Sequence, residues 1–253
     1  MKRGISGFSV IRNAIAGDYC IQECIASMLP VSDEVVIGDA SSDDGTGEML
    51  QEWSRKEPKL RIVKQPWKQP VNERRWFVNW INQTRSELSY DQQLFLDADE
   101  VICEGAYSQL KQAKHGDCFT FRRLNFWRDA RTVIAEGETC GHMVTRFGPS
   151  ALFMPSDEPY GIEDIPEIIR RSVHYPALRI FHYGFLRSRE GMVQKSKVNL
   201  KAFFGTFDSR VAAAAANPDQ PWHDSFKHEK PYTTYAGGHP EHCLAWLRSR
   251  KAL

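Results

Sequence analysis

The sequence predicts an α/β fold in which a central, mostly parallel sheet is flanked by helices. Three observations carry this prediction. Short apolar stretches alternate with helix-spaced stretches through the first half of the chain, and strands separated by helices in this way form parallel βαβ units. The chain has 253 residues, 42% of them hydrophobic, which is enough to bury the core of one large domain. No repeat or linker-like stretch divides it, so we expect a single domain over residues 1–253.

The first half contains the clearest elements. Residues 18–29 place Ile21, Ile25 and Met28 at helical spacing and stop at Pro30, which cannot continue a helix. The same patterns predict further helices over 46–56 and 73–85, and strands over 7–11, 34–38, 60–63 and 93–96.

The second half is less regular. Apolar stretches predict strands over 118–124, 144–147 and 178–183. Helical spacing predicts helices over 188–204 and 212–216.

Polar residues follow three of the predicted strands. Arg12 and Asn13 follow the first strand, residues 39–44 follow the second, and residues 97–100 follow the fourth. Ligands of parallel sheets bind beyond the carboxyl ends of the strands. We therefore expect these three clusters to converge on one edge of the sheet.

The acidic turn after the fourth strand is the most specific of the three clusters. Asp97 and Asp99 can face one cation, and carboxylate oxygens are the ligands that Mg²⁺ and Mn²⁺ prefer. A solvated acidic turn or helix start explains the same residues equally well. In the second cluster, Asp39 is suited to accept a hydrogen bond from a nucleobase N–H. Asp43 and Asp44 are better explained as caps of the following helix.

These clusters, taken in order and in strand context, resemble the nucleotide-sugar half of family 2 glycosyltransferases with the GT-A fold. A second segment resembles the HYG(W/F)xR…K stretch of one bacterial and viral branch of that family, and a third resembles its terminal G-x-HP stretch. One departure is that typical members read D-D-G-S where this chain reads G-D-A-S at 38–41. The segments that carry the resemblance are residues 12–13, 36–46, 95–100, 181–187 with Lys195, and 238–240.

The resemblance implies a GT-A domain with a nucleotide-sugar-binding half over residues 1–105 and an acceptor-binding half with a C-terminal segment over 106–253. It implies a nucleotide-sugar donor, with a UDP-sugar favoured. The nucleotide-binding residues that it implies are Arg12, Asn13, Asp39, Asp97, Arg187 and Lys195. In that set Asp39 contacts the base, and Arg187 and Lys195 neutralise the leaving diphosphate.

The resemblance also implies a metal site and a catalytic base. Mn²⁺ or Mg²⁺ would be held by Asp99, with Asp97 and His182 as further ligands. Family 2 members invert the anomeric centre with one base, which lies in an acidic segment beyond the metal-binding turn. The base candidates are Asp164, Glu163 and Asp157, with Asp164 favoured, although capping of a helix start explains these acids as well.

The expected function is metal-dependent transfer of a sugar from a nucleotide donor to a hydroxyl of a saccharide or lipopolysaccharide-type acceptor. A glycosyltransferase acting on modified bases of phage DNA is an alternative, which the net charge of +1 disfavours. A nucleotidyltransferase would also use an acidic metal turn, and a non-catalytic sugar-binding protein could keep the same fold. A Gly-rich, basic loop after the first strand would favour the nucleotidyltransferase, and residues 13–18 do not form one.

Composition also indicates where the protein is found. No apolar run approaches the ~20 residues of a membrane span, and the first residues lack the apolar core of a signal peptide. The six cysteines have no CxxC spacing, which is typical of reduced thiols. We therefore expect a cytoplasmic protein. His239, His242 and Cys243 also allow a zinc site, but no second cluster accompanies them.

Overall fold

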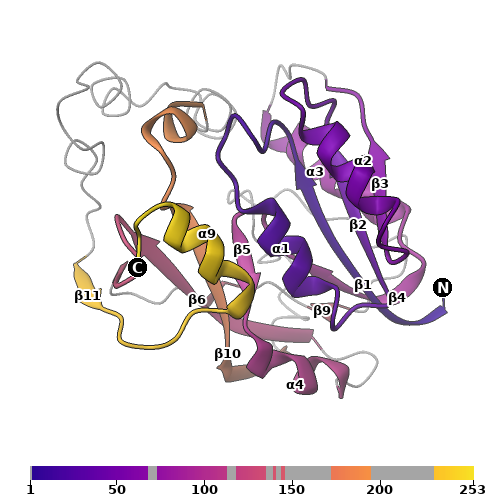
Figure 1. The fold of residues 1–253 in the computed structure, drawn as a ribbon. Helices are drawn as coiled ribbons and strands as arrows, with labels where there is room; N and C mark the ends of the chain where they lie inside the picture. The colour runs from indigo at the N-terminus through magenta and orange to yellow at the C-terminus, as the bar shows by residue number, and fades with distance from the viewer. Residues whose placement is uncertain are drawn as a thin grey trace.

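A five-stranded sheet carries the first half of the chain in the computed structural model (Figure 1). Its order is β3-β2-β1-β4-β9, and the strands are β1 (Lys2–Ile11), β2 (Glu34–Asp39), β3 (Leu60–Lys64), β4 (Tyr90–Phe95) and β9 (Val144–Thr145). The first four run parallel, and β9 is antiparallel to β4. The structure describes residues 2–67, 73–112, 118–134, 139–140, 144–145, 172–194 and 231–253.

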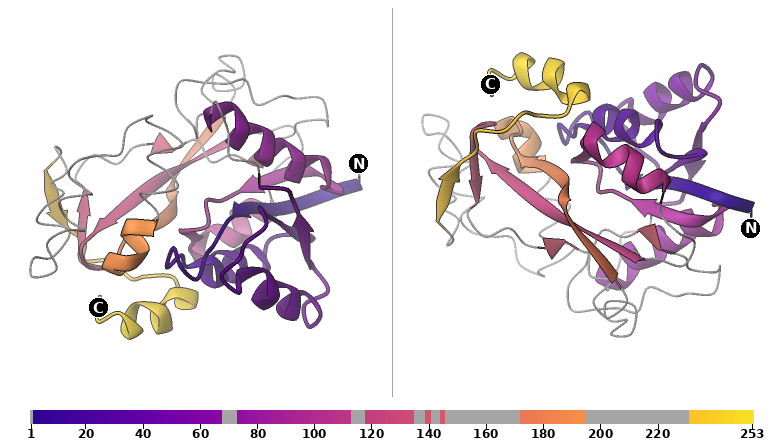
Figure 2. Two further views of the ribbon diagram at one scale, coloured as in Figure 1. Left: turned by 90° about the horizontal axis from the view of Figure 1, so that it is seen from above. Right: turned by 90° about the horizontal axis from the view of Figure 1, so that it is seen from below.

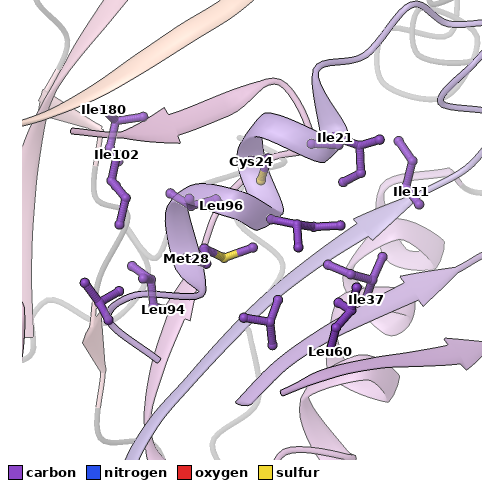
Figure 3. Packing of buried hydrophobic residues seen from close by; sticks show 14 of the residues in the cluster. Ile11, Ile21, Cys24, Met28, Ile37, Leu60, Leu94, Leu96, Ile102 and Ile180 are labelled. Carbon is purple, nitrogen blue, oxygen red and sulfur yellow. The ribbon is translucent and has the colours of Figure 1, made fainter. Parts of the chain in front are cut away.

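Helices cover both faces of this sheet because successive strand residues face opposite sides. Ile5, Ile37 and Leu94 point to the face that holds α1 (Ile21–Met28) and α2 (Thr46–Ser54), as Figure 3 shows for part of this core. The opposite face buries Phe8, Val36 and Phe95 against α3 (Glu73–Ser86). The sheet is therefore apolar on both sides, as expected for parallel strands.

A second, mixed sheet of six strands carries the other half. β6 (Cys118–Trp127) and the long β10 (Ser172–Phe185) run parallel at its centre. Its path is β11-β7-β6-β10-β5, with β8 also paired to β6. The remaining strands are β5 (Glu100–Ile102), β7 (Thr132–Ile134), β8 (Thr139–Cys140) and β11 (Tyr232–Thr234). Because β4 lies in the first sheet and β5 in the second, the short turn between them connects the two sheets.

Short helices close the second half. The 3₁₀ helix η1 (Glu104–Ala106) runs into α4 (Tyr107–Lys111), residues 189–194 are helical, and η2 (Glu241–Cys243) leads into α9 (Leu244–Ser249). η2 contacts α1, and α9 lies beside α1 in Figure 2, so the end of the chain returns to the first helix. In the part of the chain that the structure describes, no helix combines the length and apolarity needed to cross a membrane.

The predicted α/β class with a mostly parallel sheet flanked by helices is confirmed. Every strand and helix predicted in the first half is present, with ends shifted by a few residues. The sequence patterns did not predict the short elements β5, β7, α4 and α9. The predicted helix over 212–216 and most of that over 188–204 lie outside the described residues. The division into halves at residue 105 stays a prediction.

Candidate active site

The carboxyl ends of β1, β2 and β4 meet at one edge of the first sheet, as the strand pattern predicts. Ile11 pairs with Asp39 at the end of β2, and Phe8 pairs with Phe95 at the end of β4. Three loops leave this edge, and the end of β10 approaches them. The backbone N–H of Tyr183 in β10 donates to the carbonyl of Asp99 at 2.9 Å.

Arg12 and Asn13 form a network with the loop after β2. The Arg12 guanidinium donates to the Ala40 carbonyl at 2.7 Å, pairs with Asp43 at 2.9 Å, and lies 4.6 Å from the ring centre of Trp67. Asn13 exchanges two hydrogen bonds with Asp43, at 2.7 and 3.0 Å. The two predicted nucleotide-binding residues are thus neighbours. Asp43 connects them instead of capping α2, which corrects the capping prediction for that residue.

Gly45 occupies the N-cap position of α2, and Asp44, which was predicted to cap this helix, lies one residue before it. Its carboxylate accepts the N–H of Thr46 at 3.0 Å and the N–H of Ala16 at 2.7 Å. Burial raises the pKa of Asp44, but these hydrogen bonds outweigh it, so the net shift is downward. Gly45 has a φ of 94°, which favours glycine where the chain turns into α2. Asp44 therefore ties the loop after β1 to the start of α2.

Asp39 is buried at the end of β2, with 2% of its surface exposed. Its Oδ1 accepts the N–H of Ser42 at 3.1 Å and the hydroxyl of Ser42 at 2.5 Å. Its Oδ2 lies 3.0 Å from the place that a Cβ on Gly47 would take. The carboxylate thus shapes the loop that leads into α2, and its contact with a nucleobase stays a prediction.

The two aspartates of the acidic turn have different partners. The Asp97 carboxylate lies 3.8 Å from the Arg123 guanidinium, which also pairs with Glu100 at 2.9 Å. Arg123 is largely buried, with 12% of its side chain exposed. The Asp99 carboxylate instead faces His182 and Arg187 in β10 and just beyond it. Because the chain turns at residues 98–99, the carboxylates of Asp97 and Asp99 have different partners.

Asp99, His182 and Arg187 form a buried cluster between the two sheets. Each is at most 6% exposed. Asp99 Oδ1 lies 3.5 Å from His182 Nε2, and Asp99 Oδ2 pairs with the Arg187 guanidinium. His182 Nδ1 is hydrogen-bonded to Asn125 Oδ1 at 2.8 Å. This contact orients the imidazole so that Nε2 is directed at Asp99.

Asp99 and His182 are close enough to share one divalent cation. A Cβ on Gly184 would lie 2.4 Å from His182 Nε2 and 2.8 Å from Asp99 Oδ2, so any larger residue would displace one of these groups. Two donors about 2.1 Å from one cation are roughly 3 Å apart, close to the 3.5 Å observed. Asn125 orients the imidazole in the way that outer partners orient metal ligands.

No three metal-ligating side chains converge anywhere in the described ranges. Two protein ligands suit a site that substrate oxygens complete, because Mg²⁺-type ions are commonly held by one or two side chains together with phosphates. The placement of Asp97 beside Arg123 leaves its role as a further ligand a prediction.

Asp18 connects the loop after β1 to the second half of the chain. The Asp18 carboxylate accepts the N–H of Ser188 at 2.7 Å and pairs with the guanidinium of Arg250. Burial raises the pKa of Asp18, but the Ser188 hydrogen bond and the Arg250 charge outweigh it and lower the pKa overall. The sequence patterns placed Asp18 only at a helix start, and no local signal links it to residues 170 and 232 positions away.

Several predicted residues lie outside the part of the chain that the structure describes. These are the base candidates Asp164, Glu163 and Asp157, together with Lys195. Their roles stay predictions.

The terminal G-x-HP stretch lies in an aromatic cluster. His239 Nδ1 is 2.9 Å from the Tyr183 hydroxyl, and His239 Nε2 is 2.9 Å from the Ala130 carbonyl. The His239 ring packs against Phe126 at a centroid distance of 4.9 Å. His242 instead contacts the Tyr107 hydroxyl at 3.0 Å. Both His239 nitrogens have protein partners, so this histidine holds the C-terminal segment onto the second sheet.

Protonation of His239 is expected to destabilise the fold. Burial lowers its pKa below the ordinary value of about 6.5, and the Ala130 hydrogen bond offsets only part of this. The unfolded chain therefore binds more protons than the folded chain near and below pH 6.5, so stability is complete above that pH and falls as the pH drops through it. Urea unfolding between pH 7.5 and 5.5 should show this decline, and His239→Asn should flatten it. His242→Asn should keep the decline, and an equal slope in His239→Asn would contradict the assignment.

The comparisons with known proteins give one family match and several similar solved structures. Residues 17–121 match the family model "Glycosyl transferase family 2". No curated protein sequence matches the chain. Among solved structures, the chain is similar to TarS of S. aureus, with 15% identity, a TM-score of 0.47, and coverage of 89% of this chain and 72% of that one. It is also similar to the mannosyltransferase PcManGT of Pyrobaculum calidifontis, with 13% identity, a TM-score of 0.46, and coverage of 87% of this chain and 67% of that one. For GalNAc-T7 the identity is 9%, the TM-score is 0.48, and the coverage is 87% of this chain and 53% of that one.

Proposed function

Because residues 17–121 match the model of glycosyl transferase family 2, we propose that this chain is a metal-dependent glycosyltransferase that transfers a sugar from a nucleotide donor to a hydroxyl group. The matched segment contains the loop after β2 and the acidic turn, so it includes Asp39 and Asp99. The observation that carries the proposal is the pair of Asp99 and His182 at 3.5 Å, against which glycine packs at position 184.

In this proposal the two edge loops bind the nucleotide and the buried cluster binds its diphosphate. Arg12 and Asn13, already joined through Asp43, line the nucleotide side, and Asp39 lies at the end of the neighbouring strand. Asp99 Oδ1 and His182 Nε2 would hold Mn²⁺ or Mg²⁺. Such a cation, when bound, stabilises the negative charge that develops on the departing diphosphate.

The acceptor side of the proposal depends on the second half of the chain. An acceptor hydroxyl needs a base within hydrogen-bond reach, and we propose Asp164 for this role, with Glu163 and Asp157 as alternatives. Attack from the face opposite the diphosphate would invert the anomeric centre. We propose a saccharide acceptor and a UDP-sugar donor. The net charge of +1 gives little support for a DNA acceptor.

The proposal is tested by a thermal-shift screen of UDP-, GDP-, CMP- and dTDP-sugars with and without Mn²⁺. A donor at ~100 times its dissociation constant should stabilise the folded chain by roughly 2.7 kcal/mol. One nucleotide class should give a shift that requires Mn²⁺, and incubation with that donor should release nucleoside diphosphate. A shift without release would indicate a binding protein, and no shift with any donor would contradict the proposal.

A further inference from the structure

We propose that Arg187 is a positioning residue that holds Asp99 in place for the cation, and that it does not bind the leaving diphosphate. The inference rests on the proposed function, because it concerns how the same site binds its metal. It departs from the role that the family resemblance implies for this arginine.

Arg187 is enclosed by the protein. Its side chain is 1% exposed. Nε donates to the Gly184 carbonyl at 3.0 Å, Nη1 donates to the Gly17 carbonyl, and Nη2 pairs with Asp99 Oδ2. The face of the guanidinium lies 3.5 Å from the ring centre of Tyr19. All three nitrogens and one face are therefore engaged, and a diphosphate could reach the group only by displacing these contacts.

These contacts join the three segments that build the site. Gly17 and Tyr19 belong to the loop after β1, Asp99 to the turn between β4 and β5, and Gly184 to the end of β10. A guanidinium presents its donors in a fixed planar fork, so these bonds fix the orientation of the group. Lysine has no such fork and could keep the charge beside Asp99 without holding both carbonyls.

The two carboxylate oxygens of Asp99 have different partners. Oδ2 binds Arg187, and Oδ1 faces His182 Nε2 at 3.5 Å. Arg187 thus restricts the carboxylate to one rotamer, in which Oδ1 is directed at the cation position. Outer partners of metal ligands act in this way.

The test is a double-mutant cycle of Arg187→Lys and Asp99→Asn, read out as the affinity for UDP with and without Mn²⁺. If Arg187 acts through Asp99, Arg187→Lys should weaken Mn²⁺-dependent UDP binding about 10- to 100-fold in the wild-type background. The same change should have little further effect once Asp99 is Asn. UDP affinity without Mn²⁺ should stay unchanged. Arg61→Lys, a change on β3 at an exposed ion pair with Glu87, is the matched control and should leave every affinity unchanged.

The outcomes separate the two proposals. Losses that add in the double variant, or a loss of metal-free UDP affinity in Arg187→Lys, would show a direct contact with the diphosphate and overturn the positioning role. A wild-type chain that binds UDP in neither condition would overturn the UDP-sugar donor, and the cycle would then use the nucleotide that the donor screen identifies. A chain that binds no nucleotide of that screen would overturn the proposed function itself and, with it, the inference. If Arg187→Lys lowers the melting temperature, all affinities are measured at a temperature at which the least stable variant is still folded.

Discussion

Asp99→Asn is expected to abolish the Mn²⁺-dependent part of nucleotide-sugar binding. The carboxylate is 5% exposed and, together with His182, faces the proposed cation position. Asparagine keeps the size of the side chain and an oxygen that can accept from Arg187, but it lacks the negative charge that a hard divalent cation requires. Thermal shift and calorimetric titration, each with and without Mn²⁺, measure the loss.

Asp97→Asn is the matched comparison for this prediction, because the two residues share one turn. Asp97 lies beside Arg123, at 3.8 Å, and away from the contacts that Asp99 makes. The Mn²⁺-dependent thermal shift should therefore be smaller in Asp99→Asn than in Asp97→Asn. A shift that survives in Asp99→Asn and disappears in Asp97→Asn would contradict the assignment of Asp99 as the main ligand.

Gly184→Ala is expected to reduce Mn²⁺-dependent binding as strongly as the loss of a ligand. The added methyl group would lie 2.4 Å from His182 Nε2, the proposed ligand, and 2.8 Å from Asp99 Oδ2, which binds Arg187, so the imidazole or the carboxylate must move. Both are buried, and overpacking of this kind costs about 1–3 kcal/mol of stability. The backbone itself tolerates alanine, because φ of Gly184 is not positive.

Gly105→Ala is the control for that change. A Cβ at Gly105 would meet only Cys103 Sγ, at 3.9 Å, which is an ordinary contact distance. Metal titration and thermal unfolding should show no change for Gly105→Ala and a loss of both metal affinity and stability for Gly184→Ala. Full Mn²⁺ affinity in a folded Gly184→Ala chain would show that the cation binds elsewhere.

The first half of the fold could be predicted from sequence because each strand there has a strong local signal. Strand β2 is buried on both faces and reads as one apolar run ending at Asp39. Strand β5 has only three residues, which are too few to show any period. In β10, Pro176 lies at the register shift between Tyr175 and Arg179. Because a proline argues against a continuous strand, the sequence predicted only residues 178–183 and missed the first part of β10.

Residues of the candidate site could be named from the sequence, but the contacts between them could not. Asp99 and His182 were named from the family resemblance, yet they are brought together only when β5 pairs with β10. Arg187, to which the resemblance assigns the leaving diphosphate, is instead buried by contacts with Gly17, Tyr19 and Asp99, which are distant in sequence. Gly184 stands inside the HYG segment, so its signal was present, but its function depends on the distance from a Cβ to two distant side chains.

The central claim is that Asp99 and His182 hold a divalent cation at the edge of the first sheet. The most direct measurement is anomalous diffraction at the manganese absorption edge from crystals grown with Mn²⁺ and UDP. The account predicts one strong peak in contact with Asp99 Oδ1 and His182 Nε2, with the diphosphate as a further ligand. A peak bound to other residues, or UDP bound away from Asp39 and Asp99, would contradict it.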